Sequence, residues 1–174
     1  MSYKEHVQRN TLGRQFAQTS GQPRAYVIPL VAIVLASFSA CSTVLMNTPM
    51  YQRTDGWTIT LSQVRDGPDT YPTPQIHYDP GKGEKFIWTL VTVRNDLSSV
   101  RTFSYDACDL DGDGQTFLPV LVDRHTFLNA LTDKTESFDP GQERTRQLIY
   151  SYPKNSRPTR VQCGPIAFPV PQAR

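Results

Sequence analysis

The amino-acid sequence predicts an all-β domain, a β-sandwich of six to seven strands, preceded by an N-terminal hydrophobic helix. Residues 57–61 alternate apolar and polar side chains, which is typical of a half-buried strand. Residues 85–93 are apolar on nearly both faces, which indicates a central strand. Turn-forming residues separate the runs at short spacing, and no helix-length periodic segment follows residue 46.

Further strands are expected at residues 102–108, 116–122, 147–153 and 159–168. Between the first two strands, prolines at positions 68, 72, 74 and 80 favour a loop, because proline interrupts both helices and central strands. Residues 123–137 match no single pattern and allow a helical turn. This order of short strands favours two packed sheets.

A hydrophobic segment over residues 25–41 predicts export from the cytoplasm and attachment to a membrane. Residues 1–24 form its basic n-region, which stays on the cytoplasmic side. Residues 42–54 show no strand alternation and contain turn-prone residues, so we expect a tether there. The sandwich is then expected over residues 55–174.

Two mechanisms of attachment fit this segment. Residues 38–41, Phe-Ser-Ala-Cys, resemble the lipobox of bacterial lipoproteins, a resemblance that implies acylation of Cys41 after cleavage before it. Alternatively, residues 26–46 carry no charge and match the ~20 residues that a helix needs to span a bilayer, so the segment is an uncleaved signal anchor. Either mechanism makes membrane lipid a partner.

The charge distribution argues against nucleic acid as a partner. The chain has a net charge of +2, but residues 1–40 carry +3. The remaining residues contain fourteen Lys and Arg against fifteen Asp and Glu. A nearly neutral domain lacks the basic surface that a polyanion requires.

The order of motifs over residues 55–168 resembles the telokin-like, immunoglobulin-like domain of unknown function found in bacterial and archaeal lipoproteins. The matching elements are Trp57–Thr60, Val91–Asn95, Leu110–Gly114 with Phe117, Pro140–Gln142, and Leu148–Tyr150 leading to Pro153. The resemblance implies an immunoglobulin-like β-sandwich on a cell-envelope surface. It implies no activity, because that family has no common catalytic residues.

Two cysteines remain beyond Cys41, namely Cys108 and Cys163. An exported compartment permits disulfides, so we expect these two thiols to be bonded. Two separate buried thiols are the alternative.

Three aspartates precede a glycine at spacing i, i+2 and i+4, as in the first half of a calcium-binding loop. They are Asp109, Asp111 and Asp113. The twelfth position of such a loop requires a bidentate Glu but is Val120 here. We therefore expect no metal site but a hairpin turn, with Gly112 and Gly114 at the positions of positive φ.

Four arginines allow a partner patch in the C-terminal part of the chain. Arg144 and Arg146 share one strand face, and Arg157 and Arg160 follow across the next turn. A solvated sheet face is the simpler interpretation.

No motif predicts an enzyme or a cofactor. Serine-hydrolase, phosphate-loop and dinucleotide motifs are absent, and His77 and His125 are expected on the surface or in loops. The sequence predicts a membrane-anchored, extracytoplasmic binding module for a protein partner, on the periplasmic or cell-surface side. The alternative is an accessory structural subunit of an envelope membrane complex, held by an uncleaved signal-anchor helix.

Overall fold

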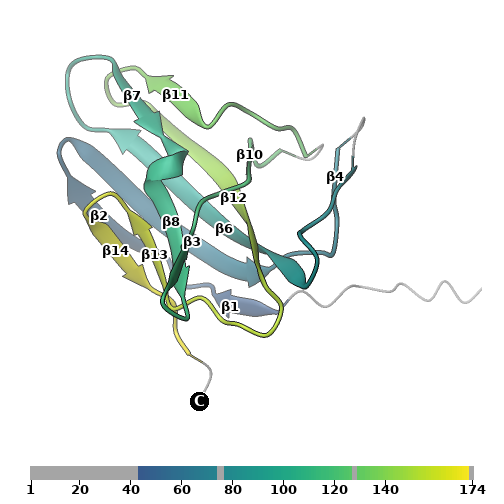
Figure 1. The fold of residues 1–174 in the computed structure, drawn as a ribbon. Helices are drawn as coiled ribbons and strands as arrows, with labels where there is room; N and C mark the ends of the chain where they lie inside the picture. The colour runs from purple at the N-terminus through teal and green to yellow at the C-terminus, as the bar shows by residue number, and fades with distance from the viewer. Residues whose placement is uncertain (1–42, 74–76, 127–128, 173–174) are drawn as a thin grey trace, which may run out of the picture. The chain divides into compact units, whose positions relative to one another are not determined.

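The computed structural model describes residues 43–73, 77–126 and 129–172 (Figure 1). The described residues belong to one compact unit. The hydrophobic helix predicted for residues 25–41 and its Cys41 lie outside the described residues. Among those that are described, no helix has the length and apolarity needed to cross a membrane.

One layer of the fold is a six-stranded antiparallel sheet built around β6 (Glu84–Asn95). β6 lies between β3 (Trp57–Asp66) and β12 (Glu143–Pro153), which confirms the prediction of a central strand. β1 and β2 pair with β3 along its other edge, and β10 pairs with β12. Their bounds are β1 Val44–Met46, β2 Met50–Thr54 and β10 Leu121–Asp123.

The second layer consists of two short sheets in front of the first (Figure 1). β11 pairs with β7, and β7 continues through a 3-10 turn, Tyr105–Ala107, into β8 of the four-stranded sheet β14-β13-β8-β9. The two layers form a β-sandwich. The bounds are β7 Arg101–Ser104, β8 Cys108–Gly112, β9 Gln115–Phe117, β11 Thr135–Phe138, β13 Arg160–Cys163 and β14 Ile166–Pro169.

The main hydrophobic core lies between the two layers. Alternate residues of β3 are buried there, as the period of two predicts, and they include Trp57, Ile59 and Leu61. Trp57 packs edge-on against Phe103 and Phe138, with ring centroids 5.2 and 5.5 Å away. Such edge-to-face pairs stabilise a core beyond the apolar area that they bury.

A second, smaller hydrophobic cluster covers the other face of the six-stranded sheet. Phe86 and Trp88 of β6 pack there with Tyr71 of the proline-containing loop. This loop contains a short hairpin, β4 (Tyr71–Pro72) with β5 (His77–Tyr78). The Tyr71 hydroxyl donates a hydrogen bond to the buried Asp123 carboxylate. Burial and this carboxylate both raise the pKa of Tyr71, so the loop is fastened by a neutral phenol.

The predicted tether over residues 42–54 is wrong, because β1 and β2 lie within it and belong to the six-stranded sheet. Asp55 and Gly56, with φ of 46° and 76°, form a two-residue turn between Thr54 and Trp57, which face each other in register. Asp-Gly favours such hairpin turns because both residues tolerate positive φ. The sandwich therefore begins before residue 55.

Two predicted strands are interrupted, and the described residues contain fourteen strands rather than six or seven. The run 116–122 divides into β9 in one layer and β10 in the other, with Pro119 between them. Proline has no N–H to donate to a ladder, so the chain changes layers there. The run 102–108 bends at the 3-10 turn, and the described part of 123–137 contains no helix before β11 begins.

Replacement of Gly112 by alanine is expected to destabilise the fold by roughly 1–3 kcal/mol. A Cβ atom at Gly112 would lie 1.8 Å from the Tyr152 hydroxyl and 2.7 Å from the Arg157 carbonyl oxygen. Urea denaturation measures the loss. The control is Gly114→Asn, because Gly114 has open space around it and Asn tolerates its φ of 74°. Equal stability of the two variants would contradict the close contact.

Candidate functional site at one end of the sandwich

Turns from both layers meet at one end of the sandwich, which we call the loop end and define as residues 53–57, 94–104 and 163–165. The Asp96 amide donates a hydrogen bond to the Gly56 carbonyl at 2.8 Å. The Leu97 side chain covers Gly56 so closely that a Cβ there would be 2.4 Å from it. Arg101 donates a hydrogen bond to the Asp55 carbonyl. The β2–β3 turn and the β6–β7 loop are therefore joined.

A polar network lines an open hollow of about 530 Å³ at the loop end. Asp96 accepts hydrogen bonds from the Thr58 hydroxyl at 2.5 Å and from Arg94 Nε at 2.7 Å, and Arg53 donates to Thr58 at 3.1 Å. The Thr58 hydrogen bond contributes most to holding the pKa of Asp96 below its ordinary value, and Arg94 adds to it against slight burial. This carboxylate is therefore ionised and partnered at neutral pH.

A smaller hollow of about 230 Å³ lies between β7 and the β13–β14 turn. Trp57 and Ile59 of the other layer line it, together with Cys163. The Arg101 guanidinium lies 4.8 Å from the centroid of the Trp57 ring. The hollow is smaller than the roughly 300–1,000 Å³ of typical small-molecule sites, so it suits a side chain better than a cofactor.

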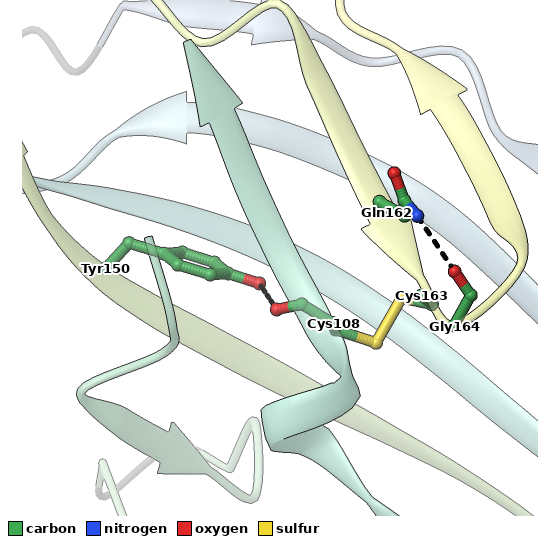
Figure 2. The surroundings of a disulfide bond; sticks show 5 residues. All are labelled: Cys108, Tyr150, Gln162, Cys163 and Gly164. Carbon is green, nitrogen blue, oxygen red and sulfur yellow. Dashed lines mark hydrogen bonds between the residues drawn. A yellow bond between two sulfur atoms is a disulfide. The ribbon is translucent and has the colours of Figure 1, made fainter. Parts of the chain in front are cut away.

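The disulfide between Cys108 and Cys163 is present, as predicted (Figure 2). The two residues face each other in the register of β8 and β13, and both are buried. From the other layer, the Tyr150 hydroxyl donates a hydrogen bond to the Cys108 carbonyl at 2.9 Å (Figure 2). The bridge thus fixes the end of β13, where Cys163 borders the smaller hollow.

The aspartate motif forms the predicted hairpin turn, between β8 and β9. Its residues of positive φ are Asp113 at 51° and Gly114 at 74°, so the expectation of positive φ at Gly112 is wrong. Gly112 serves close packing instead, since it lies against Tyr152. Among the described residues, no group of three His, Cys, Asp or Glu side chains is arranged to hold a metal ion.

Asp111 already has partners in this hairpin. It accepts hydrogen bonds from Thr116 at 2.7 Å and from Arg160 at 2.6 and 2.9 Å. Burial opposes ionisation, but these bonds and the Arg160 charge hold the pKa of Asp111 below its ordinary value. The pKa of Asp109 is raised by burial and by the nearby Asp111. Asp111 therefore loses its proton at a lower pH than Asp109 does.

Calcium at millimolar concentration is expected to leave the melting temperature of the protein unchanged relative to chelator, because Asp111 is committed to Arg160. Differential scanning fluorimetry with chelator and then with calcium checks this. A rise of several degrees that Asp111→Asn with Asp113→Asn abolishes would overturn it.

The four arginines, for which the sequence allowed a partner patch, do not lie together in the structure. Arg144 and Arg146 alternate with buried Leu148 and share its face of β12, where both pair with Glu136 of β11. Arg160 lies on β13 in the other layer and pairs with Asp111, while Arg157 lies in the loop between β12 and β13. Arg144, Arg146 and Arg160 are thus paired with two carboxylates, Glu136 and Asp111.

His77 and His125 are exposed, as predicted. His77 begins β5, and His125 follows β10, where its backbone N–H donates a hydrogen bond to the Asp123 carboxylate at 2.5 Å. Neither lies in the loop end.

The sequence reasoning missed the loop end entirely. One signal was present: Asp55-Gly56, directly before the strand-like run 57–61, favours a hairpin turn, and in the structure this turn brings Arg53 opposite Thr58. The approach of Asp96 and Arg101 to this hairpin depends on how distant strands align. Local patterns carry no such information.

Comparison with known proteins supports the fold alone. No protein-family model matches the chain, and no curated protein matches its sequence. A conserved hypothetical protein from Bacillus anthracis is similar in structure, with a TM-score of 0.53, 14% identity, and coverage of 74% of this chain and 95% of that one. The chain thus shares its fold with that protein.

Two further solved structures are more distantly similar. An uncharacterized beta-sandwich protein from Clostridium difficile 630 has a TM-score of 0.46 and 17% identity, with coverage of 64% of this chain and 80% of that one. A functionally unknown protein from Listeria monocytogenes EGD-e has a TM-score of 0.45 and 10% identity, with coverage of 69% and 74%.

Proposed function

We propose that this protein is a non-enzymatic, immunoglobulin-like interaction module, held on the extracytoplasmic side of a membrane by its N-terminal segment, which binds a protein partner through its loop end. The proposal rests on the direction of β3, which runs from the loop end to the end where β1 follows the N-terminal segment. Val44 of β1 pairs with Arg65 at one end of β3, whereas Trp57 begins β3 at the loop end. At about 3.3 Å per residue, the ten residues of β3 separate the two ends by roughly 30 Å.

The side chains of the loop end support binding of a protein. Leu97 and Val100 of the β6–β7 loop are 45% and 61% exposed. The Leu97 side chain lies against Gly56, which lines the same hollow as Arg53, Arg94 and Asp96. Apolar side chains with a polar rim are the usual composition of a protein–protein interface. The nearly neutral charge of residues 41–174 also favours a protein over nucleic acid.

The proposed anchor is acylated Cys41, and β1 begins only three residues after it. A lipoprotein of this kind has almost no tether, so its sandwich is held close to the membrane surface with the loop end pointing away. Intact mass of the protein isolated from membranes should show loss of residues 1–40 and added acyl mass, and Cys41→Ala should leave an unprocessed precursor. Recovery of a peptide covering residues 1–9 would contradict cleavage and favour the uncleaved signal anchor.

Site-specific photo-crosslinking in cells tests the binding surface. A photoreactive residue replaces Val100 in the full-length chain, and the control replaces Lys154, which is exposed in the turn that follows β12. Lys154 lies at the opposite end, because Pro153 pairs with Glu84 while Glu143 pairs with Arg94. We expect a discrete crosslinked protein from position 100 only. No product at position 100, or a product at position 154 alone, would contradict the proposal.

A further inference from the structure

One edge of β7 has no partner strand among the residues that the structure describes, since β7 pairs only with β11. The Tyr105 N–H donates a hydrogen bond to the Lys134 carbonyl at 2.7 Å, so Tyr105 directs its backbone groups toward the side of β11. In an antiparallel pair, successive residues direct their backbone groups alternately toward the partner strand and away from it. Thr102 therefore directs its N–H and C=O groups to the free edge, and Ser104 directs its N–H there, whereas the Ser104 C=O, as the N-cap of the 3-10 turn, accepts the first bond of that turn.

The free edge of β7 borders the 230 Å³ hollow. β13 pairs with β8 in the same layer, but β13 ends at Cys163. Beyond it the Gly164 N–H donates a hydrogen bond to the Ala107 carbonyl at 2.8 Å, and the chain turns away into β14. The hollow thus occupies the place where a strand beside β7 would continue the layer.

The groups that line the hollow indicate what fits there. Its floor is apolar, because Trp57 and Ile59 belong to the core. Arg101 has no carboxylate partner within the described ranges, since its guanidinium contacts only the Asp55 carbonyl and the Trp57 ring. An uncompensated cation beside an apolar floor favours an occupant with an acidic side chain next to an apolar one.

We propose that the loop end binds an extended segment of a partner protein, which adds as a strand to the free edge of β7. One apolar side chain of the segment enters the hollow, and an acidic side chain reaches Arg101. The N–H groups of residues 102 and 104 and the C=O of Thr102 are matched by the main chain of another strand, which is the basis of β-strand addition. The inference rests on the proposed function, because it specifies how that partner binds.

The test uses Thr102→Pro and a matched control, Ser137→Pro, in the full-length chain in detergent. Proline at position 102 removes an N–H that faces the free edge and leaves the β7–β11 bonds intact. Ser137 faces Thr102 across the pair, so its N–H points away from β7 on the opposite side. The probe is a phage-displayed library of random decapeptides selected on the wild-type protein. A selected peptide should bind Thr102→Pro at least about tenfold more weakly and Ser137→Pro unchanged.

Two further readouts apply if Thr102→Pro fails to fold. N-methylation along the selected peptide should weaken binding at alternate residues only, because a strand directs every second N–H to its neighbour. Arg101→Gln should weaken binding severalfold and reduce its salt dependence.

Equal binding to wild type and Thr102→Pro, or N-methyl effects without alternation, would overturn the inference. So would a selection that enriches no peptide. The proposed function is judged separately, by the crosslink from position 100.

Discussion

Reduction of the Cys108–Cys163 disulfide is expected to lower the free energy of unfolding by about 4 kcal/mol. The two cysteines are 55 residues apart, and in the chain-entropy model a loop of that length restricts the unfolded state by this amount. Domains of this size are typically stable by only about 5–15 kcal/mol, so the bridge accounts for much of the total. Urea denaturation with and without reductant measures the difference.

The double variant Cys108→Ser with Cys163→Ser is the control, and it should match the reduced protein. Thiol labelling of the unreduced, denatured protein should find neither cysteine reactive. Labelling of both cysteines, or stability that reductant does not change, would contradict the expected contribution.

Replacement of Glu136 by glutamine is expected to lower the free energy of unfolding by about 3 kcal/mol. Glu136 is 9% exposed and bonds Arg146 through both oxygens, at 2.8 and 3.0 Å, while Arg144 lies 3.5 Å away. Its loss leaves two guanidinium groups without a counter-charge near the core. The exposed pair of Asp106 with Lys134 offers a control, and Asp106→Asn should change stability by less than about 1 kcal/mol.

The same carboxylate predicts a pH dependence. Burial opposes ionisation of Glu136, but Arg146 outweighs it and the pKa lies below its ordinary value. A lowered pKa contributes stability above the unfolded-state value of about 4.3, and this contribution is lost as the pH falls through the folded-state value. Wild type should therefore lose more stability than Glu136→Gln between neutral pH and pH 3. Parallel pH profiles in urea denaturation would contradict this assignment.

The strands with strong patterns were predictable from the sequence. The apolar run at 85–93 identified the centre of the six-stranded sheet, since a strand covered on both faces needs apolar side chains on both. The disulfide followed from the count of cysteines and the expected compartment. The tether was mispredicted because β2 has three consecutive exposed residues and hence no alternation to detect.

The arrangement at the loop end could not be predicted, because it depends on the alignment of distant strands. Arg144 and Arg146 share a strand face in the sequence, but only the placement of β11 brings Glu136 to them. The free edge of β7 exists because β13 ends before the turn at Gly164. The sequence of β7 does not indicate where β13 ends.

Thiol labelling of spheroplasts tests on which side of the membrane the domain lies. Val100→Cys places a thiol at a position that is 61% exposed, while Cys108 and Cys163 stay bonded and buried. A membrane-impermeant maleimide should label this residue equally in intact and lysed spheroplasts, and the labelled protein should sediment with membranes after carbonate washing. Labelling only after lysis, or recovery in the washed supernatant, would contradict an extracytoplasmic, membrane-anchored module.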